Sequence, residues 1–148
     1  MSVESKIKSV AESLTPALSY YFGDWNRTNM ALDTQSLPAI VYVMPASGEF
    51  DLGAGNVRDK ENALIAFLDK TTFDFEASEN NIIVDNMKAL AMRFFVACNN
   101  SGLFDPIGGK LPYRVVYDML DVNVTGITFE VPIKEVTGKC IKGLQVNK

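Results

Sequence analysis

The segment from Ser78 to Gly102 constrains the fold of this chain more than any other part. Its apolar side chains recur at spacings of three and four residues, the period of an amphipathic α-helix, and they include Ile82, Ile83, Met87, Leu90, Ala91, Phe94, Phe95 and Cys98. Ser78 is a suitable N-cap, and the sequence NNSG ends the run with Gly102 as a left-handed C-cap. A stripe so rich in Phe and Met is more typical of a protein core than of a cofactor site. We therefore expect a buried helix that packs on a sheet.

The segments before this helix have the composition of β-strands. Residues 39–45 (AIVYVMP) form a β-branched and aromatic run that ends in proline, which predicts a central strand. Residues 48–52 (GEFDL) alternate polar and apolar side chains and predict a half-exposed strand, with Phe50 and Leu52 on one face. Residues 61–69 are short and apolar enough for either helix or strand, and their period of two favours a strand.

Two more strands are predicted after the helix, beyond a loop rich in proline and glycine at 103–112. They cover residues 113–120 (YRVVYDML) and 123–136 (NVTGITFEVPIKEV), and the second alternates cleanly between apolar and polar positions. Pro132 cannot donate a hydrogen bond to a strand ladder. We therefore expect the second strand at an edge of the sheet, or its proline facing outward at one.

The N-terminal region carries another apolar stripe at helical spacing, formed by Val3, Ile7, Val10, Leu14, Leu18 and Tyr21. It predicts a helix that lies on the sheet, with a kink or break at Pro16 because proline disfavours helical angles in the residue before it. Residues 23–38 are polar and irregular and predict a long connection. We expect Trp25, within it, to pack against the edge of the core.

Together these segments predict the α+β class. We expect residues 1–148 to form a single domain, with an antiparallel sheet of about five to six strands and two main helices packed on one face. A chain of 148 residues buries ~68–70% of the surface that its unfolded form exposes, which is enough for a core without disulfides or metals.

The stretch DLGAGNVRDKEN, residues 51–62, raises the question of a phosphate-binding loop. A dinucleotide loop needs G-x-G-x-x-G between a strand and the start of a helix. Gly53 and Gly55 match the first two positions, but Arg58 occupies the third, and no Lys-Ser or Lys-Thr pair follows as a P-loop requires. The glycines therefore predict a wide turn between antiparallel strands rather than a nucleotide site.

Catalytic and metal-binding side chains are sparse in this sequence. Histidine is absent, which removes the commonest general base and transition-metal ligand. Asp74 and Glu76 would point the same way from a strand-like segment, but a solvated strand end explains them better than acid–base chemistry. Asp118 and Asp121 match no calcium loop, and we find no paired base for Tyr20, Tyr21 or Tyr113. No residue is predicted to be catalytic, to bind a cofactor or to ligate a metal, so we expect no enzyme.

The net charge and the hydropathy limit the classes of partner and the cellular compartment that we expect for this chain. The net charge of −4 argues against a broad nucleic-acid surface. No stretch approaches the ~20 apolar residues of a transmembrane helix, and the N-terminus has no apolar run typical of a signal peptide. Cys98, on the apolar helix, is expected to be a buried reduced thiol; a disulfide with Cys140 is the alternative.

In order and pattern the chain resembles small phage and prophage tail proteins, above all the tail-terminator and minor-tail class. The residues that carry the likeness are LPAIVYVMP (37–45), NVRDKENALIAFLDKTTFDF (56–75) and DVNVTGITFEVPI (121–133). The resemblance implies a non-enzymatic structural subunit that associates with itself in a ring and with other tail subunits, in the cytoplasm during assembly and then in the virion. The class has no catalytic signature to carry over, so we expect no cofactor and no small-molecule substrate. From the charge and hydropathy above we expect no nucleic acid and no membrane as partner.

Two other functions stay open at this point. The first is a small α+β binding module whose helices and sheet enclose an apolar ligand cavity. The second is an enzyme that relies on the carboxylates of Asp74 and Glu76.

Overall fold

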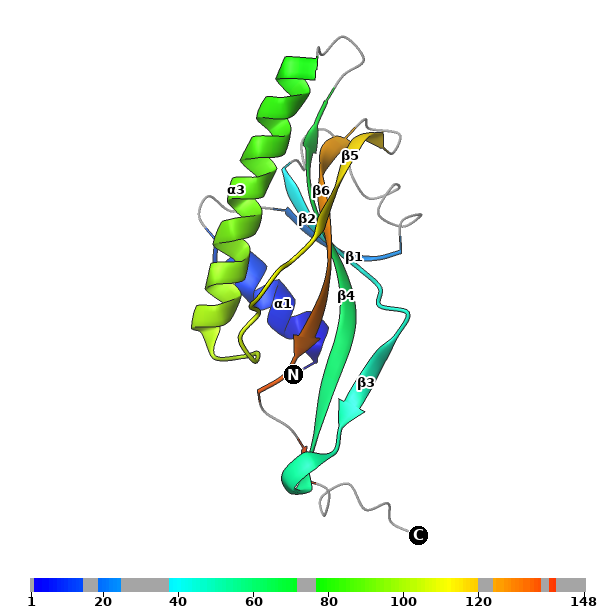
Figure 1. Cartoon of the computed structure of the whole chain (residues 1–148), viewed down its shortest axis with the longest axis vertical. Helices are drawn as coiled ribbons and strands as arrows, with labels where there is room; N and C mark the ends of the chain where they lie inside the picture. The colour runs from blue at the N-terminus through cyan, green and yellow to red at the C-terminus, as the bar shows by residue number, and fades with distance from the viewer. Residues whose placement is uncertain are drawn as a thin grey trace.

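The computed structural model describes residues 2–14, 19–24, 38–71, 77–119, 124–136 and 139–140. The elements formed by these residues follow the order α1 (Val3–Glu12), β1 (Ser19–Gly23), β2 (Ala39–Val43), β3 (Gly48–Asp51), η1 (Gly53–Gly55), β4 (Asn56–Lys70), α3 (Ala77–Ser101), β5 (Tyr113–Met119), β6 (Val124–Lys134) and β7 (Lys139–Cys140) (Figure 1). This arrangement confirms the predicted α+β class.

The long strand β4 organises the sheet. The described strands run in the order β1-β2-β4-β6-β5, and β3 and β7 also pair with β4. An extended strand of 15 residues spans ~50 Å, so β4 can pair with β3 along its first half and with β2 along its second half on the same side. The strand assignment that the sequence favoured for 61–69 is therefore confirmed. The sheet is mostly antiparallel, as predicted, but β1 runs parallel to β2.

The N-terminal helix is shorter than the apolar stripe predicts. α1 ends at Glu12, and residues 19–23 (SYYFG) form β1, so the assignment of Tyr21 to a helix is wrong. Tyr20 packs with the cluster on one face of the sheet and Tyr21 with the cluster on the other, as strand alternation requires. Helical spacing continued by coincidence into a short run of aromatic residues that favour strands. The predicted break at Pro16 and the position of Trp25 lie outside the described residues.

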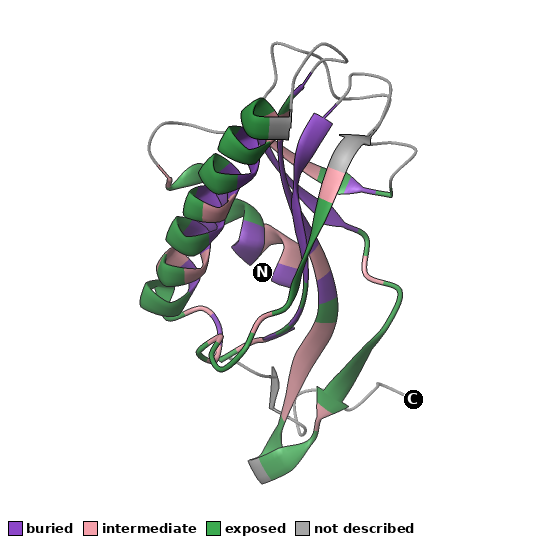
Figure 2. Ribbon diagram, turned by 45° about the horizontal axis from the view of Figure 1, so that its top comes forward, coloured by how far each residue is buried: buried purple, intermediate pink, exposed green. Residues whose placement is uncertain are grey.

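The main core lies between the helices and the sheet. The buried side chains of α1 and α3 join one cluster with Ala63, Ile65 and Phe67 of β4. Figure 2 shows buried residues in both helices and in the central strands. At its centre the ring of Phe67 meets the rings of Phe94 and Phe129 edge to face, at centroid distances of 5.6 and 5.8 Å. Such pairs add to the stabilisation from buried apolar area.

The predicted buried stripe of α3 is confirmed at all but one position. Ile83, Met87, Leu90, Ala91, Phe94 and Cys98 are buried, and Phe95 is partly buried against them. Ile82 is 61% exposed, so its assignment to the core is wrong. Successive residues of a helix are rotated by about 100°, and Ile83 takes the inward position instead. The helix also begins at Ala77, one residue before the predicted N-cap Ser78.

The opposite face of the sheet holds a second, smaller buried cluster. It comprises Ala39, Val41, Val43, Ala66, Leu68 and Val124. β2 contributes to both clusters and is buried at every position. The predicted central strand is therefore confirmed, although it ends at Val43 and not at Pro45.

Pro132 shows how a central strand can still contain proline. β6 lies between β4 and β5, but β5 reaches only to Phe129 in the register, so from Glu130 onward β6 lacks that neighbour. Asn62, the partner of Pro132 on β4, donates its N–H to the Ser47 carbonyl, away from β6. The pair is therefore of the non-hydrogen-bonded kind, and the missing N–H of Pro132 falls on the open side of β6. The predicted edge position of Pro132 is correct locally, although the strand as a whole is central.

Candidate functional site

An arm of two strands extends from the sheet past both helices (Figure 1). This β3–β4 hairpin, residues 48–61, pairs Phe50 with Asp59 and Glu49 with Lys60, and an ion pair of 3.0 Å joins the side chains of Glu49 and Lys60. The predicted turn at Gly53 and Gly55 is confirmed: both belong to η1, and Gly55 has φ +78°, which a residue with a Cβ rarely adopts.

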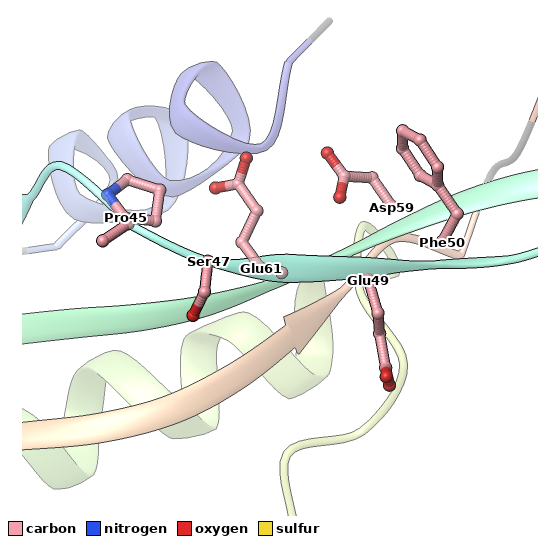
Figure 3. Close-up of a pocket in the computed structure, with 8 residues that line it drawn as sticks. Pro45, Ser47, Glu49, Phe50, Asp59 and Glu61 are labelled. Carbon is pink, nitrogen blue, oxygen red and sulfur yellow. The ribbon is translucent and has the colours of Figure 1, made fainter.

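The tip of the arm carries two large apolar side chains in solvent. Phe50 is 70% exposed and Leu52 is 62% exposed. The sequence predicted the strand and its alternation, and Figure 3 shows Phe50 and Glu49 on opposite sides. It did not predict that the apolar side would lack a covering layer, because alternation shows that two faces differ and not what lies over each. Single exposed apolar residues are ordinary on a protein surface, but here two lie together near the end of a projecting hairpin.

A hollow of about 510 Å³ lies at the base of the hairpin (Figure 3). The segment 45–50 forms one wall, and Asp59 and Glu61 of β4 form the other. The carboxylates of Asp59 and Glu61 point to the same side as the Phe50 ring. The hollow is therefore open, acidic and rimmed by one aromatic side chain. A basic side chain from another protein would suit it better than an apolar ligand.

Ion pairs anchor the hairpin to the rest of the fold. Asp51 accepts a hydrogen bond from Lys134 of β6 and lies 3.4 Å from Arg58. Arg58 also lies 3.5 Å from Asp105 of the loop after α3. The hydrogen bond from Lys134, helped by the Gly53 N–H, lowers the pKa of Asp51 from its ordinary 3.8 to about 2. These contacts join three segments that are distant in sequence and fix the direction of the arm.

Two tyrosines on the helix side of the sheet pair with carboxylates. Tyr42 donates a hydrogen bond to Glu61, and Tyr20 donates one to Glu4 over 3.0 Å. The sequence-based view that Tyr20 has no paired base is therefore wrong; the partner lies on α1. Burial, followed by the effects of the neighbouring carboxylate, raises the pKa of both phenols well above the ordinary value. Both stay protonated at neutral pH, so these pairs act as hydrogen bonds between elements rather than as general bases.

Those sequence candidates that the structure describes do not converge on one reactive centre. The position where a dinucleotide loop would have its third glycine is Arg58, which lies on a strand and engages Asp51 and Asp105. Tyr113 pairs in β5 with Phe129 and packs near its ring, at a centroid distance of 6.0 Å. Among the described residues, no three His, Cys, Asp or Glu side chains lie close enough to hold a metal ion.

Several candidates from the sequence cannot be placed. Asp74, Glu76 and Asp121 lie outside the described residues, and the side chains of Asp118 and Cys140 do as well. Cys98 is a buried free thiol, as predicted, and burial raises the pKa of its thiol to about 12.

Within the described parts of the chain, neither helix combines the length and the apolar composition needed to cross a membrane. Comparison of the sequence with protein-family models and with curated proteins finds no match.

Proposed function

We propose that this protein is a non-enzymatic structural subunit of a phage or prophage tail, of the tail-terminator or minor-tail type, which assembles through protein–protein contacts. The observation that carries the proposal is the β3–β4 hairpin, an anchored arm whose tip exposes Phe50 and Leu52. An assembly subunit needs apolar surface that stays in solvent until its neighbour arrives. The resemblance of the strand-rich segments to tail proteins supplies the class of assembly.

The chemistry of the described residues also supports a structural role. Polar side chains at the interface of the helices with the sheet connect one element to another: Lys6 of α1 pairs with Glu135 after β6 over 3.0 Å, and Tyr20 of β1 donates a hydrogen bond to Glu4 of α1. A catalytic group would instead need room beside it for a substrate.

The alternative function, a binding module with an apolar ligand cavity, has less support. Phenylalanine rings fill the centre of the helix–sheet interface, where such a cavity would be expected. The hollow at the hairpin is open and lined by carboxylates, whereas ligand pockets are mainly apolar and enclosed.

Light scattering and electron microscopy of the purified protein test the proposal. We expect mass to rise with concentration, and rings of uniform diameter in the images. The double variant Phe50→Ser, Leu52→Ser should shift assembly to higher concentration, whereas Met44→Ser, which changes an exposed residue outside the hairpin, should not. A monomer at every concentration in the parent protein, without rings, would argue against a self-assembling subunit.

A further inference from the structure

Helix α3 is apolar on two sides. Its inward side packs on the sheet, yet its outward side also exposes Ile82, Met92 and Val96, at 61%, 66% and 58%. Ala89, also exposed, lies between them at helical spacing. These four positions, seven, three and four residues apart, fall on one stripe. A helix with apolar residues on both sides is typical of one that is covered on both sides, and among the described residues nothing buries this outward stripe.

The chain therefore carries two separate apolar surfaces: the hairpin tip with Phe50 and Leu52, and the outward stripe of α3. Figures 1 and 2 show β3 and its turn at one end of the molecule, away from α3. The two surfaces cannot meet within one chain, because the outward stripe faces away from the sheet, whereas the hairpin is part of the sheet and the ion pair of Asp51 with Lys134 ties it to β6.

The charges beside the two surfaces are complementary. On the hairpin, the carboxylates of Asp59 and Glu61 lie on the same side as Phe50. On α3, the residue next to Met92 is the exposed Arg93, whereas the exposed acidic residues Glu79 and Asp85 lie nearer the N-terminus of the helix. An acidic hairpin is attracted to the C-terminal half of the outward stripe and repelled by the N-terminal half.

We propose that the outward side of α3, around Met92 and Val96, is the docking surface for the β3–β4 hairpin of a second copy of this chain. Phe50 and Leu52 of one copy pack on Met92 and Val96 of the next, and Asp59 approaches Arg93. The proposal rests on the self-assembly proposed above and adds which surfaces meet. Because the two surfaces differ, the contact is head-to-tail; repeated by rotation, it closes a ring or builds a filament.

Disulfide trapping tests the contact. The variants Phe50→Cys and Met92→Cys are made separately in a Cys140→Ser background; Cys98 stays, because its buried thiol does not compete. We expect a disulfide-linked dimer when the two variants are mixed and oxidised, and neither variant alone should give it. The double variant Phe50→Cys, Met92→Cys should give a ladder of linked subunits. The matched control is a mixture of Phe50→Cys with Ser78→Cys, at the other end of the same helix, which should not crosslink.

A charge variant provides a second measurement. Met92→Glu should raise the concentration needed for assembly by roughly tenfold or more, as for a central contact, while its circular dichroism and thermal unfolding stay those of the parent. Ile82→Glu, in the acidic half of the stripe, should change assembly much less.

The outcomes separate this inference from the proposed function. If the parent protein assembles but the mixture of Phe50→Cys and Met92→Cys gives no linked dimer, the hairpin does not dock on α3, although the subunit role stands. Dimers from Phe50→Cys alone would likewise overturn the inference, since they indicate contact between two hairpins. If the parent protein does not assemble at any concentration, both proposals fail.

Discussion

β6 leaves no room for a side chain at Gly126, where it pairs with β4, and replacing this glycine tests the sheet directly. Gly126 pairs with Leu68 of β4 and with Val116 of β5. A Cβ at position 126 would lie 1.9 Å from the backbone oxygen of Phe67 and 3.1 Å from the Cα of Leu68. Both obstacles are backbone atoms of the strand that organises the sheet, so no side-chain rotation relieves the contact.

The cost of Gly126→Ala follows from that geometry. The nearest ordinary contact of such a carbon with an oxygen is a little over 3 Å, so the two strands would have to separate by more than an ångström. Inserting one carbon into a well-packed core typically costs ~1–3 kcal/mol. The distorted ladder adds roughly 1 kcal/mol for each hydrogen bond lost. We expect a loss of at least about 3 kcal/mol, a large fraction of the ~5–15 kcal/mol that stabilises a typical domain.

Urea unfolding followed by far-UV circular dichroism measures the effect. With a urea dependence of ~1–3 kcal/mol per molar, the midpoint of Gly126→Ala should fall by more than about 1 M. Gly48→Ala, where a Cβ would lie 2.8 Å from the Lys60 oxygen, should cost less because the hairpin is peripheral. Gly108→Ala is the control: no heavy atom lies within 4 Å of its Cβ position. If Gly126→Ala unfolds at the same urea concentration as Gly108→Ala, the register of β4 and β6 described above is wrong.

Three further predictions concern charged and titratable groups. The folded pKa of Asp51, about 2, lies below its ordinary 3.8; its stabilising effect should therefore be complete above pH 4 and be lost as the pH falls from about 4 to about 2. Acid unfolding curves of Asp51→Asn should show less of that loss, and a curve identical to the parent's would refute the assignment. Lys6→Ala leaves the largely buried Glu135 without its partner and should cost about 3 kcal/mol in urea unfolding, whereas the pair Lys6→Met, Glu135→Leu should recover most of the stability. Cys98, with its pKa of about 12, should react with iodoacetamide at pH 8 only on unfolding in a Cys140→Ser background; rapid labelling of the native protein would contradict its burial.

If the hairpin docks on α3, different residues of this fold stabilise the core and mediate assembly. The core beneath α3 is closed by aromatic side chains, while the groups proposed for assembly lie on the hairpin and on the far side of the helix. Substitutions at Phe50 or Met92 should therefore change assembly without changing folding. The two readouts, oligomer mass and urea midpoint, can be measured on the same variants.

Local patterns in the sequence determined the class of fold and most of its elements. The stripe in 82–98 predicted α3, the β-branched run at 39–45 predicted the central strand, and the period of two in 61–69 predicted a strand. These patterns predict secondary structure because burial of one side of a helix or strand imposes a regular spacing on its apolar residues. The spacing is the same whichever element packs on the buried side. The same reasoning wrongly placed Tyr21 in a helix, because a few apolar residues can fit both the period of a helix and the period of a strand.

The tertiary structure alone decided which surfaces are left uncovered and which distant residues meet. Alternation in GEFDL could not show that Phe50 projects into solvent, and helical spacing could not show that Ile83 turns inward while Ile82 does not. Likewise, the pairing of Asp51 with Lys134 joins residues far apart in the chain. The exposure of a side chain and its ion pairs depend on the relative positions of whole helices and strands. These positions are set by the packing of the complete sheet and not by any local run of residues.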